Sequence, residues 1–153
     1  MDAKQNIPNV FIQIQAKFTR LYTGILNCYE LTLPQYALLS VLALAEVPLT
    51  MTEVSSKLYI SKPAVTSLVD RLEKNEMIVR QNDPNDRRVN LLKLKPKGEK
   101  TVQEIRSIII GDLMVKTLEQ FNQAEKKNVE DFFQNLSCNL DAMFLRYQEG
   151  KES

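Results

Sequence analysis

The sequence contains no histidine, only four glycines and only two cysteines among its 153 residues. Without histidine, the chain lacks the commonest general base and a common metal ligand. The glycines are scattered and form no phosphate-cradling loop, and no serine or cysteine has a catalytic partner nearby in the sequence. We therefore expect a protein that is not an enzyme and that has no resident metal or cofactor.

The remaining absences concern disulfides and membranes. Cys28 and Cys138 are too few for a disulfide framework, and nothing near them has the spacing of a zinc site. The N-terminal segment has no signal-peptide core, because glutamines and Lys17 interrupt it. The longest nearly apolar run, Tyr36 to Ala45, is far too short to span a bilayer. These features predict a cytoplasmic protein that has no membrane partner.

The charges are divided unevenly along a chain whose net charge is only +1. Residues 57–100 contain eleven basic and six acidic side chains, a balance of +5, whereas the rest of the chain has a balance of −4. A basic segment within an acidic remainder favours one surface that binds a polyanion. An ordinary solvated surface is the alternative.

The centre of the basic segment has the pattern of an amphipathic helix from Ser61 to about Asn75. Its apolar positions recur at helical spacing and can share one buried face. These positions are Val65, Leu68, Val69 and Leu72. Ser61 is a good N-cap, and Pro63 in the first turn costs no intrahelical hydrogen bond. A helix of this kind fits the major groove of DNA.

A second, shorter helix is predicted just before it. Thr50 and Glu53 have the spacing of a capping box, which places this helix from about Met51 to Leu58. Residues 59–60 then form a tight connection between the two helices. Two short helices joined in this way make a helix-turn-helix.

The segment after these helices predicts a β-hairpin. Residues 77–81 and 89–95 have strand patterns, and the turn-forming residues 82–86 separate them. Asp86 and Arg88 are two residues apart and can pair on one side of an extended segment, whereas Arg87 faces the other side. The expected fold is therefore mainly α with a small β-hairpin wing, which is a winged helix-turn-helix.

Helices with apolar stripes are expected on both sides of the helix-turn-helix and wing. Two precede it, at residues 8–26 and 32–45, and two follow it, at residues 98–118 and from Asn122 onward. The central segment is too small to cover all of these stripes. We expect a homodimer held by an N-terminal helix (1–30) and C-terminal helices (98–153) around a DNA-binding domain (31–97). A monomeric helical bundle would produce the same stripes.

The segment from about residue 31 to 100 resembles the MarR family of ligand-responsive transcriptional regulators. The matching stretches are Leu33-Pro34-Gln35-Tyr36, Thr66 to Lys74, Asp83-Pro84-Asn85-Asp86-Arg87-Arg88 and Lys95-Pro96-Lys97-Gly98. Two positions depart from the family pattern. Ser67 stands where a longer basic residue is frequent, so the base-reading code differs. Glu76 stands where glycine is usual, and we predict that Asn75 adopts the left-handed conformation instead.

A twofold dimer would place two recognition helices on one pseudo-palindromic operator. The expected DNA contacts are Thr50, Thr52, Ser61, Lys62, Pro63, Thr66, Ser67, Asp70 and Arg71 from the two helices and Asp86, Arg87 and Arg88 from the wing. Asp70 should pair with a base amino group or a neighbouring cation, because it would repel phosphate. The resemblance implies that Arg88 enters the minor groove while Asp86 holds it. A purely structural Asp86–Arg88 pair is compatible with this role.

The resemblance also implies a repressor that a small-molecule effector releases from DNA. Effectors in this family are often aromatic or phenolic acids, but the sequence does not identify the effector or its pocket. One alternative is a winged helix that binds another protein and not DNA. Another is a redox sensor that uses Cys28. For both cysteines a structural thiol is the better interpretation. Cys28 is expected to be buried or half-buried and has no basic residue nearby to activate it, and Cys138 lies between core positions.

Overall fold

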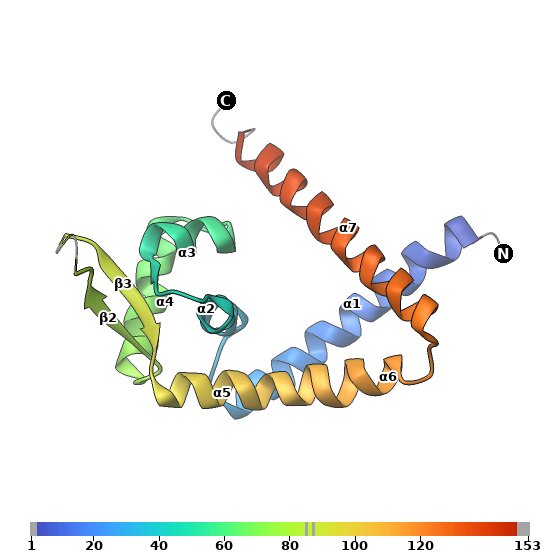
Figure 1. Ribbon diagram of the computed structural model, residues 1–153, viewed down its shortest axis with the longest axis horizontal. Coiled ribbons are helices and arrows are strands. Elements are labelled where there is room, and N and C mark those ends of the chain that lie inside the picture. The colour runs from blue at the N-terminus through green and yellow to red at the C-terminus, as the bar shows by residue number, and fades with distance from the viewer. Residues whose placement is uncertain (1–2, 85, 87, 150–153) are drawn as a thin grey trace. The chain divides into compact units, whose positions relative to one another are not determined.

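The computed structural model describes residues 3–84, 86 and 88–149, which divide into two compact units between Ile105 and Arg106. The first unit contains α1 (Ala3–Cys28), α2 (Leu33–Leu44), β1 (Leu49–Thr50), α3 (Met51–Leu58), α4 (Lys62–Lys74), β2 (Ile78–Asn82), β3 (Asn90–Leu94) and most of α5 (Pro96–Arg106). The second contains η1 (Ser107–Val115), α6 (Lys116–Leu118) and α7 (Gln123–Glu149). The predicted fold class, mainly helical with a small sheet, is confirmed (Figure 1).

Three helices of the first unit begin where side chains satisfy their free N–H groups. The Thr32 and Gln35 side chains cap α2 reciprocally, and the Thr50 and Glu53 side chains cap α3 in the same way. The Ser61 hydroxyl accepts a hydrogen bond from the Ala64 N–H at the start of α4. These caps confirm the sequence prediction for each helix start, and they explain why the boundaries of α2, α3 and α4 lie within one residue of those expected.

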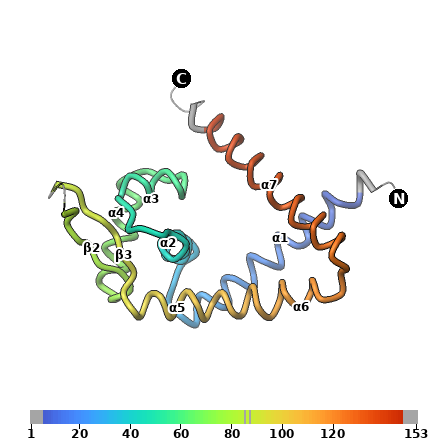
Figure 2. Tube along the Cα trace, in the orientation of Figure 1, coloured from blue at the N-terminus to red at the C-terminus, as the bar shows by residue number. Residues whose placement is uncertain are grey.

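The apolar face of α4 is the centre of the first unit. Val65, Val69 and Leu72 are fully buried, as the periodicity predicts, whereas Leu68 is only half-buried. They belong to a core shared with α2, α3 and the sheet. Its other members include Leu38, Leu39, Val54, Ile78 and Leu92. Figure 2 shows α4 running beside the β2–β3 hairpin. Burial of the apolar side therefore leaves the polar side of α4 on the surface.

The sheet has the strand order β1-β3-β2, and both pairs are antiparallel. In the hairpin, Ile78 lies opposite Leu94 and Asn82 lies opposite Asn90. The two predicted strands are present, but each begins one residue later than expected. Strand β1 was not predicted, because a strand of two residues has no detectable periodicity. Its Leu49 lies opposite Leu92 and closes the edge of the sheet beside α3.

Glycine is required at the start of α5. A Cβ built on Gly98 would lie only 2.2 Å from the carbonyl oxygen of Met77. The same carbonyl oxygen accepts a hydrogen bond from the Lys95 N–H at 2.9 Å. Close backbone contact thus fixes the segment after β3 against the segment before β2.

The end of α4 differs from the prediction. Asn75 has φ −84°, which is not left-handed, and Glu76 itself has φ 59°. The Glu76 N–H donates to the Glu73 carbonyl and the Met77 N–H donates to the Leu72 carbonyl, both at 2.9 Å. This hydrogen-bond pattern requires the left-handed residue to be Glu76 and not Asn75. Glu76 occupies the position where the family usually has glycine.

The helices at the two ends of the chain also depart from the expected boundaries. Helix α1 begins at Ala3 and not at Pro8, so this proline lies inside the helix and removes one backbone hydrogen bond. The expected helix from 98 to 118 is α-helical only to Arg106 and then π-helical from Ser107 to Val115. Apolar periodicity alone does not distinguish these two backbones. The predicted cap of α7 is confirmed by reciprocal hydrogen bonds between Asn122 and Glu125.

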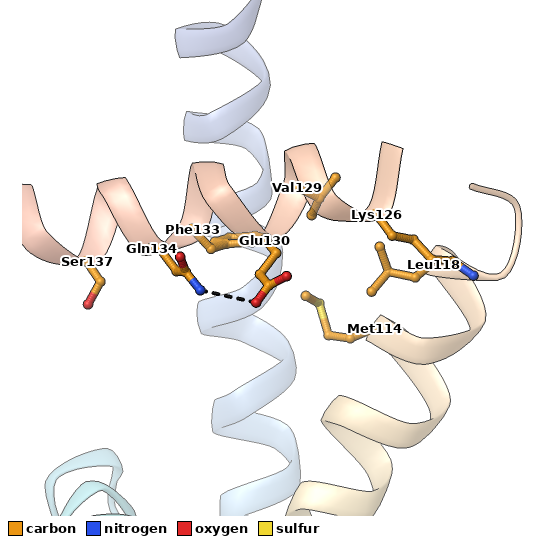
Figure 3. A pocket seen from close by; sticks show the side chains of 8 residues that line it. All are labelled: Met114, Leu118, Lys126, Val129, Glu130, Phe133, Gln134 and Ser137. Carbon is orange, nitrogen blue, oxygen red and sulfur yellow. Dashed lines mark hydrogen bonds between the residues drawn. The ribbon is translucent and has the colours of Figure 1, made fainter. Parts of the chain in front are cut away.

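Both units expose many large apolar side chains. In the first unit most of them lie along α1 and include Ile7, Phe11 and Ile14. In the second they lie along η1 and α7 and include Phe132, Met143 and Tyr147. The second unit also has a groove of about 400 Å³, where Met114, Leu118 and Phe133 provide apolar walls and Gln134 donates to Glu130 (Figure 3). Among the described residues, no helix is long and apolar enough to cross a bilayer.

The left-handed conformation of Glu76 generates a stability prediction. A Cβ in this conformation costs about 1–2 kcal/mol, so Glu76→Gly should raise the free energy of unfolding by about 1 kcal/mol. The exposed ion pair between Glu76 and Lys95 (3.2 Å) is lost in this variant, but such pairs contribute little. Urea denaturation measures the difference. Glu76→Ala is the control, because it loses the same ion pair but keeps the strained Cβ, and it should not be stabilised. A less stable glycine variant would contradict the strain argument.

Candidate nucleic-acid interface

The outer face of α4 presents polar and cationic side chains to solvent. The predicted contacts Lys62, Pro63, Thr66, Ser67 and Arg71 are all exposed, as is the cap residue Ser61. The Thr66 hydroxyl donates to the Lys62 carbonyl at 3.1 Å, so its oxygen lone pairs remain to accept a hydrogen bond. The face thus carries two long cations and two small hydroxyls, a combination that can bind phosphates and base edges.

Asp70, which lies on the same face, already has a protein partner. Its carboxylate accepts a hydrogen bond from Nη2 of Arg80 on β2, and Glu73 accepts one from Nη1 of the same guanidinium at 2.7 Å. Of the two partners expected for Asp70, the structure shows the neighbouring cation. The negative charge of Asp70 is therefore balanced within the protein, and a contact between Asp70 and DNA stays a prediction.

The start of α3 is the second candidate region. Thr52 is exposed, whereas Thr50 is half-buried and its hydroxyl donates to Glu53 at 2.8 Å. Hydrogen bonds from the Thr50 N–H and hydroxyl hold the pKa of Glu53 below its ordinary value. A carboxylate therefore occupies this helix N-terminus and competes with any phosphate there. Phosphate contacts by Thr50 and Thr52 stay predictions.

The wing tip presents Arg88. Two backbone hydrogen bonds close the turn, from Asp83 N–H to the Val89 carbonyl and from Val89 N–H to the Asp86 carbonyl. Asp86 Oδ1 accepts from the Arg88 N–H at 3.0 Å and from Arg88 Nε at 3.2 Å. The predicted Asp86–Arg88 pair is confirmed, and the Arg88 side chain is still 92% exposed. Arg87, the other predicted wing contact, lies outside the described residues.

Arg80, which was not among the predicted site residues, joins the wing to α4. Arg80 lies two residues after the buried Ile78, so its side chain points to the same side of β2. A cation in such a position is the signal for an acidic partner close by. The partner itself was not apparent, because Asp70 is ten residues away across a turn.

The cysteines differ from the expectation. Both Cys28 and Cys138 are exposed, so the core position predicted for Cys138 and the buried or half-buried position predicted for Cys28 are wrong for the single chain. The Cys28 thiol donates to the Gly24 carbonyl at 3.4 Å, within its own helix. In the described part of the chain, no group of three or more histidine, cysteine or acidic residues could hold a metal ion.

An aromatic cluster joins α1 to α2. The rings of Phe18 and Tyr22 are 6.3 Å apart, and those of Tyr22 and Tyr36 are 6.1 Å apart. Burial raises the pKa of Tyr22, and the proximity of Tyr36 adds to the rise. The Tyr22 phenol therefore keeps its proton and can donate a hydrogen bond.

Comparison with known proteins gives one consistent result. The sequence profile of the MarR family matches residues 31–89. An uncharacterized helix-turn-helix-type transcriptional regulator of Bacillus subtilis, YsmB, is 43% identical over 82 residues, which are 53% of this chain and 55% of YsmB. The matched segment thus spans about half of that relative. The family match at residues 31–89 includes α3, α4 and β2 and ends just before β3.

Solved structures extend the similarity beyond the winged helix. A MarR family protein from Bacillus stearothermophilus is 29% identical, with a TM-score of 0.74 over 92% of this chain and 98% of that one. The S. aureus MepR–DNA complex is 25% identical, with a TM-score of 0.61 over 84% and 98%. NadR in complex with 4-hydroxyphenylacetate is also 25% identical, with a TM-score of 0.68 over 89% and 95%.

These comparisons agree with the geometry of α4 and the wing. The curated relative YsmB is named a transcriptional regulator and the matched family is not a family of enzymes, which confirms the prediction that this chain is not an enzyme. Residues 31–89 therefore match the MarR family of transcriptional regulators, and the described chain has the winged helix-turn-helix fold of a solved MarR family protein.

Proposed function

We propose that two copies of this chain bind a pseudo-palindromic duplex in the cytoplasm and repress transcription there. The exposed face of α4 enters the major groove, and Arg88 of the wing enters the adjacent minor groove. The two α4 helices lie about one helical turn of DNA apart, or a multiple of one turn, on successive half-sites. A small aromatic acid releases the protein from its operator.

The observation that carries this proposal is the exposed Arg88. Its side chain is 92% exposed although Asp86 fixes its backbone and its Nε. A cation that is oriented but left in water is suited to a narrow minor groove, where the negative potential is strongest. The MepR–DNA complex supports this choice, since a protein with this fold and 25% identity binds DNA.

The dimer is proposed because both units expose apolar side chains that a second copy would cover. Phe11 on α1 is 52% exposed, and Phe132 on α7 is also 52% exposed. Monomeric soluble proteins rarely leave large contiguous apolar patches in water. An isologous twofold arrangement buries the same surface on both copies and also supplies the symmetry that a palindromic operator requires.

The effector is proposed to be an aromatic carboxylate. Tyr22 and Tyr36 provide two aromatic rings with phenol groups close together on α1 and α2. Such groups can stack on an aromatic ring and donate hydrogen bonds to its carboxylate. NadR, at 25% identity, binds 4-hydroxyphenylacetate, which supports this chemical class. The ligand would act by favouring a dimer whose two α4 helices no longer match the grooves.

Selection from random duplexes tests the central proposal. Purified protein is mixed with a pool of random duplexes at low salt, and the bound fraction is amplified and sequenced. We expect enrichment of an inverted repeat, and we expect affinity to fall steeply as salt rises, because phosphate contacts release counterions. Failure to retain any duplex at low salt would contradict DNA binding and would favour a winged helix that binds protein.

Arg88→Ala should weaken binding to the enriched duplex by about tenfold, the loss expected for one groove contact. The slope of the logarithm of the binding constant against the logarithm of the salt concentration should also become shallower by about one, because one phosphate contact is lost. Fluorescence anisotropy measures both quantities. Lys127→Ala on α7 is the matched control, because it removes an exposed cation far along the chain from the proposed interface. Equal binding by Arg88→Ala and the parent would refute the assignment of the wing.

Phe132→Glu should break the dimer, because it places a charge on apolar surface that the partner buries. The dissociation constant of the dimer should rise at least about a hundredfold, since burial of one phenylalanine contributes about 1.5–3 kcal/mol and burial of a charge costs more. Sedimentation equilibrium measures the change. Asn135→Glu introduces the same charge at an exposed polar position of α7 and should leave the dimer intact. A parent chain that sediments as a monomer would contradict the dimer directly.

Aromatic carboxylates should release the enriched duplex. Benzoate, 4-hydroxybenzoate and 4-hydroxyphenylacetate are added at millimolar concentration to the complex, and anisotropy follows the free duplex. Benzamide, which has no charge, is the control and should release less. The Tyr36→Phe variant should need more ligand, since it loses one phenol donor. If none of the acids releases the duplex, the effector class is wrong, although DNA binding stands.

A further inference from the structure

We propose that Arg80 is a positioning residue that fixes the wing relative to α4, so that Arg88 reaches DNA at a set distance from the recognition face. This inference rests on the proposed DNA binding. It assigns a role to a side chain that faces the protein and not the duplex. Arg80 would thereby determine how well a helix contact and a wing contact can be made at the same time.

Arg80 is linked to α4 by its side chain and by its backbone. One guanidinium nitrogen donates to Asp70 and another to Glu73. The Arg80 N–H also donates to Glu73, at 3.1 Å. The Arg80 side chain is only 28% exposed, whereas those of Asp70 and Glu73 are 59% and 36% exposed. Three hydrogen bonds therefore join the middle of β2 to two successive turns of α4.

The position of this link along β2 explains its importance. The strand begins in the core, where Ile78 is 1% exposed, and ends at Gln81 and Asn82, which are both exposed. The wing turn begins at Asp83, three residues after Arg80, which corresponds to about 10 Å of extended strand. Apolar packing thus fixes the base of the hairpin. Arg80 provides a second point of attachment to α4, which lies closer to the tip that carries Arg88.

The chemistry of this site favours arginine. Its planar guanidinium presents several N–H donors in a fixed geometry and can bind two carboxylates at once. Lysine has one compact ammonium group and cannot hold both carboxylates in the same geometry. Without any cation at this position, two unbalanced carboxylates would stand beside the proposed DNA surface. The test must therefore separate positioning from simple charge balance.

The test is a double-mutant cycle between Arg80 and Arg88, with the duplex that the parent chain enriches as the probe. If Arg80 positions the wing, Arg88→Ala should weaken binding by about tenfold in the parent and by less than about twofold when Arg80 is already alanine. The salt slopes of Arg80→Ala and of the double variant should then be equal, because Arg88 no longer contacts phosphate in either. Arg80→Lys should give an intermediate coupling.

Two further variants separate the possible causes. In an Arg80→Ala chain that also carries Asp70→Asn and Glu73→Gln, both carboxylates are neutral but the link is still broken. The effect of Arg88→Ala should remain small in this chain. A return to about tenfold would show that Arg80 only balances charge and would overturn the proposal. Lys95→Ala removes a different ion pair of the winged helix, with Glu76, and should leave the Arg88 effect at full size.

Circular dichroism melting shows whether each variant is folded, and Arg80→Lys replaces the alanine variant in the cycle if Arg80→Ala unfolds. Equal Arg88 effects in both backgrounds would overturn the positioning role while DNA binding stands. If the parent chain enriches no duplex, both the proposed function and this inference fail. A weakened Arg88 effect in every Arg80 variant, with the Lys95 control unchanged, would establish Arg80 as the positioning residue.

Discussion

Burial of the apolar side of α4 is the constraint on which the rest of the winged helix depends. Val65, Val69 and Leu72 are fully buried against the core, and complete burial of each aliphatic side chain contributes about 1.5–3 kcal/mol. A rotation of the helix would bring these residues into water, so the rotation is fixed. Because the apolar side is fixed inward, the side with Lys62 and Arg71 is fixed outward. The energy that forms the core therefore also orients the proposed reading surface.

Electrostatics then determines what this surface can bind. Asp70 and Glu73 would make the outer part of α4 partly acidic, but Arg80 balances both from β2. Exposed ion pairs contribute little to stability, and these three side chains are only partly buried. Their main consequence is geometric, because they join the helix and the hairpin that belong to one proposed DNA interface. Asp86 does the same on a smaller scale, since it orients Arg88 and leaves it in solvent.

The helices at the two ends of the chain differ from the winged helix because they leave large apolar side chains exposed. They expose Phe11, Phe132 and Tyr147, which a chain that works alone has no reason to leave in water. In the proposed dimer this surface is buried, and the same contacts determine the separation of the two α4 helices. A ligand that alters the contacts would change the separation and hence the fit to two successive grooves. The π-helical backbone of η1, from Ser107 to Val115, lies within this part of the chain. Such segments are rare and are often found at functional sites.

Sequence patterns predicted much of the fold because their causes are local. A capping box such as Thr50–Glu53 spans four residues, and the stripe of α4 repeats every three or four. The wing pair Asp86–Arg88 spans three residues, and it was found for the same reason. Where the sequence prediction was wrong, the structure depends on residues far apart in the sequence or on backbone hydrogen bonds. Glu76 is left-handed because of the hydrogen bonds at the end of α4, and β1 exists because β3 lies beside it.

The sequence by itself therefore determined the starts of α2, α3, α4 and α7, the amphipathic pattern of α4, the wing and the resemblance to the MarR family, since each depends on residues close together in the chain. Only the tertiary structure decided that Asp70 is bound by Arg80, that Gly98 lies against the Met77 carbonyl and that both cysteines are exposed. These facts depend on which segments come together when the core forms. No spacing along the chain encodes them, because burial of apolar surface is roughly proportional to area and does not depend on which distant residues it brings into contact.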